Sequence, residues 1–400
     1  MSLRRSPRFI ALLVLVTVLG PLAMQMFLPA LPAIQKDFAT TAGTAQLTLT
    51  LAMLAIGVAT LVFGPVSDRF GRKPVLVAGI MFYIGGSIVV ALAETIPLLI
   101  AGRIVQAGGA SAGIVLARAM ARDVYGFAQS IRVISYLTMA MVVAPTISPA
   151  IGGLVADSFG WRAIFWIMCV VGVLALAGVA AGLAETNPTR APGGWRGLIE
   201  GSRRLVVSRR YLGYALISTS SFCVFFAFLA AAPYLMAEVL QRPARDYGFW
   251  FMPVAGIFIV GTYLSTRFLD GYGADRLIRF GVFATLAVVV AALPFYYFLP
   301  LSPPLLFLPA VGFSLVQGFV IPNCQASAIN VEPRYAGAGS GLIGFIGMAG
   351  SATVAQSVAE IADGSLGPMV YFTVGAALFG VLCLPMIRKP KAPPPQPATG

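Results

Sequence analysis

Long apolar stretches separated by short polar segments cover most of this sequence. They are mostly about 20 residues long, the length at which a helix crosses a hydrocarbon core of about 30 Å. Alternation of polar and apolar residues over about ten positions, as in membrane barrels, does not recur. The pattern predicts an all-α membrane protein. The twelve predicted spans are 9–28, 46–66, 74–93, 98–119, 131–156, 163–184, 211–235, 247–268, 277–298, 304–325, 337–360 and 368–387.

The composition supports a multi-pass chain embedded in lipid. Of its 400 residues, 58% are hydrophobic and 10% are charged, and the mean hydropathy is +0.89. A soluble domain carries about 25% charged residues, so this chain could not cover a water-facing surface. The net charge of +13 comes from lysines and arginines that gather on alternate loops. That bias predicts that both termini are cytoplasmic, and it favours contact with anionic lipid rather than with nucleic acid.

A polar, arginine-rich segment at 185–210 separates two sets of six spans. It predicts a cytoplasmic linker, part of it an amphipathic surface helix, between a bundle at 1–184 and a bundle at 211–387. The proline-rich residues 388–400 are predicted to form a disordered cytoplasmic tail. The stretch 261–276 echoes the stretch 64–72 at an offset close to half the chain, which favours two pseudo-symmetric halves.

The loop after the second predicted span carries the densest charge. A charge in hydrocarbon costs at least a few kcal/mol, so this loop must lie at a water interface. The spacing of Gly64, Asp68, Arg69, Gly71 and Arg72 resembles the loop between spans 2 and 3 of the major facilitator superfamily. Gly64 is expected to permit close helix contact. The resemblance implies that Asp68, Arg69 and Arg72 form a latch that closes the cytoplasmic side in the outward-open state. The alternative is a generic basic loop.

The fourth predicted span contains an arginine, Arg103, within R-x-x-Q-A-G-G. An ionisable residue inside a span is a functional candidate by default. The sequence is similar to a pattern of drug–proton antiporters, with Ala107 where glycine is commoner, and the resemblance implies a role for Arg103 in proton coupling. The alternative is an arginine that extends to the outer interface.

The fifth predicted span resembles the G-P-x-x-G-G pattern of families that export substrates against protons, with Ser148 in place of a glycine. Pro145, Pro149, Gly152 and Gly153 predict a helix that bends and packs tightly. The alternative is a kinked packing helix with no link to the direction of transport.

The end of the first span, 24–34, closely resembles a stretch of the bicyclomycin- and florfenicol-resistance transporters, but Gln25 replaces the usual aspartate. Glutamine cannot titrate, although it can hydrogen-bond a substrate. Desolvation makes a buried carboxylate a natural proton carrier. Coupling must therefore use another acid, with Asp37 and Asp123 as the candidates in the first half, or it is altered.

Aromatic and amide side chains in the spans favour a cavity for amphipathic organic compounds. Gln25, Tyr136, Tyr234 and Gln317 are the candidate substrate contacts. The alternative for each side chain is ordinary packing.

The resemblance to the bicyclomycin- and florfenicol-resistance transporters extends over nearly the whole chain. It implies a bacterial inner-membrane transporter that exports small organic compounds by proton antiport through alternating access. The alternative is an importer or facilitator without proton coupling. The sequence has no histidine and only four scattered cysteines, so we expect no catalytic triad, metal or cofactor. No loop is long enough for a sensing domain, and we expect a monomer that binds small molecules and protons.

Overall fold

The computed structural model of the chain describes residues 7–187 and 194–388. Of the predicted tail, 388–400, residues 389–400 lie outside the described residues. Within them, twelve helices are long and apolar enough to cross a membrane. The predictions of an all-α fold and of twelve spans are therefore confirmed.

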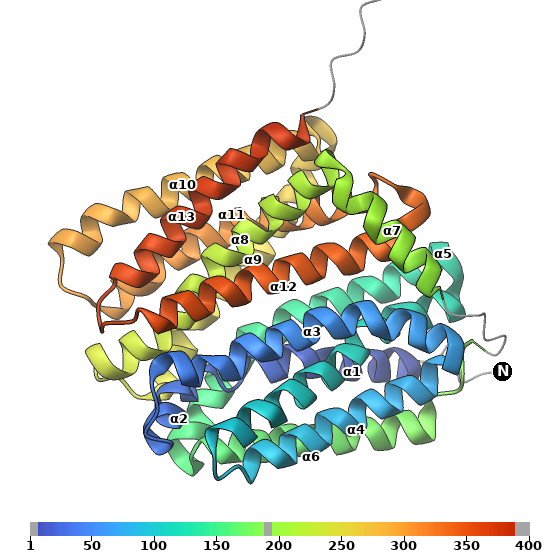
Figure 1. Cartoon of the computed structure of the whole chain (residues 1–400), viewed down its shortest axis with the longest axis horizontal. Coiled ribbons are helices and arrows are strands. Elements are labelled where there is room, and N and C mark those ends of the chain that lie inside the picture. Colours follow the sequence, from blue (N-terminus) through green and yellow to red (C-terminus); the bar gives the residue numbers. More distant parts are fainter. Residues whose placement is uncertain (1–6, 188–193, 389–400) are drawn as a thin grey trace, which may run out of the picture.

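Two groups of helices lie on either side of a shared boundary (Figure 1). The N-terminal half comprises α1 (Pro7–Gln25), η2 (Leu28–Ala30), α2 (Leu31–Asp37), α3 (Ala42–Phe70), α4 (Arg72–Ala91), α5 (Ile96–Phe159) and α6 (Trp161–Gly182). The C-terminal half comprises α8 (Arg209–Tyr234), η3 (Leu235–Val239), α9 (Ala244–Tyr272), α10 (Ala274–Phe298), α11 (Pro303–Ile329), η4 (Pro333–Tyr335), α12 (Ala336–Glu360), α13 (Gly367–Cys383) and η5 (Leu384–Ile387). At the boundary, α3 packs against α12 and α5 packs against α9.

The first, fourth and fifth predicted spans differ in the structure from the sequence-based expectation. The first continues beyond Gln25 through η2 and α2 as far as Asp37, because the prolines at 29 and 32 stand in the first turns of new short helices. The fourth and fifth are joined into the single helical stretch α5, which is broken at Gly126, where φ is +70°. A glycine takes this conformation without steric cost, so a sharp kink replaces the expected loop.

The internal echo in the sequence corresponds to a repeated helix corner. Both α3 and α9 have 29 residues, and each ends at a glycine of positive φ, Gly71 at +99° and Gly273 at +75°. The next helix, α4 or α10, begins at the following residue. The two halves therefore turn their chains in the same way at equivalent places.

The ends of the molecule differ in how the hydrophobic core is shared. We call the end that holds the α3–α4 corner the Gly71 end, and the opposite end, where α5 finishes, the Asp157 end. One large buried cluster includes side chains of both halves, such as Phe27 and Phe226. A second cluster, with Tyr211, Ile278 and Ile387 among its members, belongs to the C-terminal half and to α7 (Trp195–Val207). It lies at the Gly71 end, so there the C-terminal half has a core of its own.

The amphipathic helix predicted within the linker is α7. Its Gly201 lies against Tyr335 and Ala338 at the start of α12, and its Leu205 is buried in the second cluster. Glu200 accepts a hydrogen bond of 2.8 Å from the hydroxyl of Tyr335. The linker helix is therefore fixed to the C-terminal half.

Candidate functional site

At the Asp157 end, α5 of one half meets the start of α9 of the other half. The carboxylate of Asp157 accepts hydrogen bonds from the backbone N–H groups of Ala244 (3.1 Å) and Arg245 (3.0 Å). A Cβ on Gly153 would lie 2.5 Å from the carbonyl oxygen of Ala244, so only glycine permits this approach. The carboxylate satisfies orphan N–H groups of the first turn and complements the helix dipole.

The second contact between the halves at this end joins α12 to the start of α3. The amide nitrogen of Gln356 donates to the carbonyl oxygen of Gly43 (2.9 Å) and to Glu360 (2.7 Å), and the amide oxygen accepts from the hydroxyl of Thr50 (2.9 Å). A Cβ on Gly43 would lie 2.5 Å from the carboxyl carbon of Glu360. The carboxylate of Glu360 therefore lies directly against the first turn of α3.

These two contacts are equivalent by the pseudo-symmetry of the fold. In each, an acid at the end of the fifth span of one half lies at the start of the second span of the other half. We call Asp157 and Glu360, with their helix starts, the carboxylate clasps. The sequence analysis did not identify either acid. The available clue was that each closes an apolar run at a matching place in its half.

At the Gly71 end, charged side chains form a network within the N-terminal half. The guanidinium of Arg72 pairs with Asp68 (2.7 Å) and with Asp123 (3.2 Å), and it also donates to the hydroxyl of Ser67 (2.5 Å). Asp123 accepts a further hydrogen bond from Thr186 at the start of the linker (3.1 Å). The structure thus brings together three of the residues that the sequence analysis singled out.

Glu185, which the sequence analysis missed, fixes the linker to the same corner. Its carboxylate accepts hydrogen bonds from the backbone N–H groups of Arg72 (2.9 Å) and Lys73 (3.1 Å), which open α4, and from those of Thr186 and Asn187. Burial opposes ionisation of the Glu185 carboxyl, but these N–H groups outweigh it and hold its pKa below the ordinary value. At Gly71 a Cβ would meet this carboxylate at 2.6 Å, in addition to the positive φ.

Two other residues of the predicted gate, Arg69 and Gly64, take no part in the charge network that the structure describes. Arg69 is exposed and stacks near the ring of Phe70, at 5.3 Å from the ring centroid. No atom lies within 4 Å of the position that a Cβ would take on Gly64, so the close helix contact predicted for this glycine is absent in this conformation. The halves still touch one turn earlier, where Leu61 of α3 meets Gly341 of α12.

Arg103 is fully buried inside the N-terminal half rather than extended to an interface. Its guanidinium donates to the side-chain oxygen of Gln106 (2.5 Å) and to the carbonyl oxygen of Thr48 (3.3 Å), and it lies 3.9 Å from the ring centroid of Phe27. Among the described residues, no carboxylate lies within salt-bridge distance of it, and one terminal nitrogen, Nη2, has no partner. The positive charge is therefore balanced by a π face and by amide and carbonyl dipoles.

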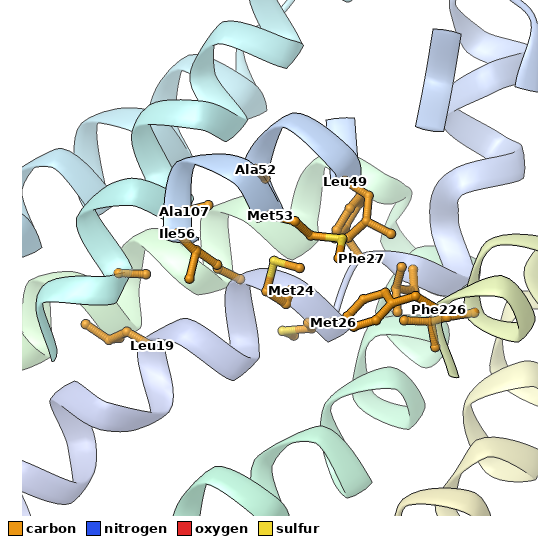
Figure 2. Close-up of a cluster of buried hydrophobic side chains, with 14 of the residues drawn as sticks. Leu19, Met24, Met26, Phe27, Leu49, Ala52, Met53, Ile56, Ala107 and Phe226 are labelled. Atoms are coloured by element: carbon orange, nitrogen blue, oxygen red, sulfur yellow. The ribbon is translucent and has the colours of Figure 1, made fainter. Parts of the chain in front are cut away.

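The end of α1 lies beside Arg103 and beside the other half. Figure 2 shows that Met24, Met26 and Met53 gather between α1 and α3, with Phe226 of α8 at the edge of the same cluster. Gln25 is buried within this region, and its side-chain oxygen has no partner among the described residues. Thioether side chains adapt to ligands of different shape. An unsatisfied amide beside them is available to a polar group of a ligand.

The structure does not bring the four predicted substrate contacts to one place. Gln317 is buried and ties α11 to α8 by donating to the carbonyl oxygen of Ser221 (2.9 Å). Tyr234 lines a cavity of about 180 Å³ at the Asp157 end, beside Gln35. Tyr136 is exposed on the part of α5 nearer the Gly71 end.

The two acids predicted to carry protons lie at opposite ends of the molecule. Asp37 is half-exposed at the Asp157 end, where it accepts from Arg162 (2.8 Å) and from the indole of Trp161 (3.0 Å). Asp123 belongs to the network around Arg72. Neither acid lies beside Arg103, so a proton route through all three residues would have to cross most of the N-terminal half.

In α5, the two glycines predicted to permit bending make close contacts between helices. A Cβ on Gly152 would lie 1.7 Å from the carbonyl oxygen of Met26, and Gly153 packs on the start of α9 as described above. Pro145 and Pro149 lie within the helix, whereas its non-helical residue is Gly126. The glycines let α5 approach both α1 and the other half.

Comparison with known proteins agrees with this architecture. The sequence profile described as "Major Facilitator Superfamily" matches residues 13–355. A bicyclomycin resistance protein homolog of Haemophilus influenzae is 29% identical over 379 residues, which cover 92% of this chain and 93% of that protein. A chloramphenicol resistance protein of Pseudomonas aeruginosa is 30% identical over 371 residues, covering 91% of this chain and 80% of that protein.

Solved structures share the fold at low sequence identity. A bacterial homolog of the human lysosomal transporter Spinster, in an inward-facing and unoccupied conformation, superposes with a TM-score of 0.74 at 16% identity, covering 98% of this chain and 100% of that one. A D-xylose–proton symporter superposes with a TM-score of 0.71 at 14% identity, covering 93% and 96%. The paired bundles and the Arg72 network agree with these matches. The chain belongs to the major facilitator superfamily, and within it resembles the transporters of the bicyclomycin-resistance type.

Proposed function

We propose that this protein exports small amphipathic organic compounds across a bacterial inner membrane, driven by proton entry, through alternating access. The bundles at 1–184 and 211–387 would rock against each other, and the linker at 185–210 would join them on the cytoplasmic side. The proposed cargo follows from the drug-resistance names of the relatives and from the methionine-rich, amide-containing region around Gln25.

One observation carries this proposal: the halves are clasped at the Asp157 end, whereas at the Gly71 end Gly64 faces open space and the C-terminal half has its own core. With both termini cytoplasmic, this is an inward-facing state. The opposite state requires that the carboxylate clasps break and that the corner at Gly71 approaches α12. We propose that Asp68, Arg69 and Arg72 then form the cytoplasmic latch with Gly64 at the contact.

The second candidate function is a facilitator or importer without proton coupling. Gln25 cannot titrate, and Arg103 has no carboxylate partner among the described residues. Both observations favour an altered coupling mechanism. Asp123 and Asp37, the acids that remain as proposed proton carriers, are already engaged in ion pairs.

A transport assay separates the two functions. The full chain is reconstituted in liposomes, and uptake or release of chloramphenicol and of a panel of lipophilic cations is followed with and without an imposed pH gradient. Antiport predicts substrate accumulation that depends on the gradient, and a pH change inside the liposomes when substrate is added. Substrate transport at the same rate with and without the pH gradient, with no accompanying movement of protons, would support the facilitator. If no compound of the panel is transported, the proposed cargo is contradicted.

Asp68→Asn is the matched variant for this assay. The substitution removes the charge that pairs with Arg72 but keeps the side chain's size, so we expect normal expression and at least tenfold slower transport because the latch is weakened. Unchanged transport by this variant would show that the ion pair belongs to a generic basic loop.

A further inference from the structure

A cavity of about 870 Å³ lies at the Gly71 end of the C-terminal half, apart from the region between the halves. It lies among the start of α8, the first turn of α10, the end of α11 and Arg388. Its volume falls within the range of about 300–1,000 Å³ that is typical of ligand sites. Nothing in the proposed transport cycle uses this cavity.

The cavity wall carries a strong excess of positive charge. Arg210, Arg276, Arg279 and Arg388 line it, against a single carboxylate, Asp275. That carboxylate is already engaged, since it accepts a hydrogen bond of 2.6 Å from Tyr214 and lies 3.7 Å from the guanidinium of Arg210.

The other three arginines have no counter-ion of their own. Among the described residues, no acid lies within salt-bridge distance of Arg276, Arg279 or Arg388. The first turn of α10 also lines the cavity, and no side chain caps it at Gly273. Arginines and an uncapped helix start bind phosphate groups by charge-assisted hydrogen bonds.

The face of α10 beyond the cavity is apolar and exposed. Phe280 and Phe283 are 57% and 54% exposed, and Val290 is 45% exposed. Together with Arg276, Arg279 and the exposed Ala287 they recur every three to four residues, so they form one stripe along the helix. A soluble anion would gain nothing from this stripe, whereas the acyl chains of a lipid would cover it.

We propose that this cavity binds the headgroup of an anionic phospholipid, with the phosphate held by Arg276, Arg279 and Arg388 and the acyl chains lying along Phe280 and Phe283. The site is independent of the transported cargo. It would fix the C-terminal half in the leaflet that faces the Gly71 end, while the N-terminal half moves.

The test uses the full-length protein in detergent micelles, with retained lipid measured by native mass spectrometry during titration with phosphatidylglycerol or phosphatidylcholine. We expect phosphatidylglycerol to bind and phosphatidylcholine to bind much more weakly. The double variant Arg276→Gln/Arg279→Gln should bind phosphatidylglycerol about tenfold more weakly or worse, because each basic residue near an anionic headgroup contributes about a fivefold preference.

The control variant, Arg203→Gln/Arg334→Gln, removes the same charge from two exposed arginines at the same end of the molecule that do not line the cavity. It should bind phosphatidylglycerol as the wild type does. An equal loss in this control, or none in the cavity variant, would overturn the proposal, since binding would then follow net charge alone.

Two further measurements separate a lipid from a soluble anion. Phe280→Ala should weaken binding of phosphatidylglycerol, and inorganic pyrophosphate should not displace the lipid at equal concentration. Displacement by pyrophosphate, with no effect of Phe280→Ala, would assign the cavity to a free phosphate compound and contradict the proposed lipid. If the double variant does not fold, the single variant Arg388→Gln gives the same comparison.

Discussion

At the scale of single residues, a few polar side chains are buried at positions where their desolvation costs free energy. Arg103 is one of the largest fully buried side chains that the structure describes, and its charge is balanced by Gln106, by the carbonyl oxygen of Thr48 and by the rings of Phe27 and Phe165. Retaining an unpaired charge inside a membrane protein is costly. A cost of this kind persists where function requires the residue.

Replacing Arg103 therefore should separate stability from activity. We expect Arg103→Met to leave the melting temperature unchanged or to raise it, because an apolar side chain removes the desolvation cost. The same variant should lose transport driven by a pH gradient. Arg103→Lys keeps the charge but not the fork that reaches Gln106 and Thr48, so it tests whether charge alone suffices. A strong fall in melting temperature with Arg103→Met would show that the arginine is mainly structural.

Glu185 is a second residue whose effect can be tested, through pH. Its folded-state pKa is lowered, so its stabilisation is present above the unfolded value of about 4.5 and is lost as pH falls through the lower folded value. We expect Glu185→Gln to destabilise the protein at pH 7 by about 1 kcal/mol or less. The difference in melting temperature between variant and wild type should shrink below about pH 4. A constant difference from pH 7 to pH 3 would contradict this account.

At the scale of helices, glycine contacts determine which elements approach across the boundary. Gly153 of α5 packs on Ala244, Gly248 of α9 packs on the backbone at Pro149, and Gly43 of α3 packs on Glu360. Helices in lipid gain little from hydrophobic association, so close backbone packing supplies much of their attraction. These contacts belong to the clasped Asp157 end.

A larger side chain at one of these glycines should open this end. In Gly153→Val, the new Cβ would meet the carbonyl oxygen of Ala244 at 2.5 Å, so α5 and α9 must separate. We expect longer distances between spin labels placed on the two helices near the Asp157 end. Gly256→Val is the control, because no atom lies within 4 Å of its Cβ position in α9. Equal distance changes in both variants would show that the effect is not local.

At the scale of the whole molecule, the carboxylate clasps stabilise one state of a two-state equilibrium. Each acid at a helix start contributes about 0.3–1 kcal/mol. The two together can shift the ratio of the clasped to the open state by about threefold to thirtyfold. Because Asp157 and Glu360 are related by the pseudo-symmetry, each half contributes one carboxylate that must leave a helix start of the other half when this end opens.

The double variant Asp157→Asn/Glu360→Gln should therefore favour the state that is open at the Asp157 end. Accessibility of a cysteine introduced near position 240 to an impermeant thiol reagent measures this shift, and we expect a several-fold faster reaction. Asp363→Asn is the control, since this exposed acid at the same end contacts Ser365 within its own loop. No change in the double variant would mean that packing alone holds this end closed.

The twelve spans could be predicted from the sequence because each apolar segment is long enough to cross the membrane. The family could be predicted because its motifs are short and lie within single segments or loops. The corner at Gly71 was also predictable, because Asp68, Arg72 and the turn glycine are neighbours in the chain. The kink at Gly126 and the extension of the first span to Asp37 were not, since backbone conformation there depends on neighbouring helices.

What the sequence by itself determined is which segments enter the membrane and which local motifs they carry, because hydrophobic length and short-range spacing act within one segment. Only the tertiary structure decided that Asp157 and Glu360 meet helix starts of the opposite half, that Glu185 holds the α4 corner, and that Arg276, Arg279 and Arg388 surround one cavity. These residues come from segments that lie far apart in the chain. Their contacts exist only once two packed bundles bring the ends of different helices together.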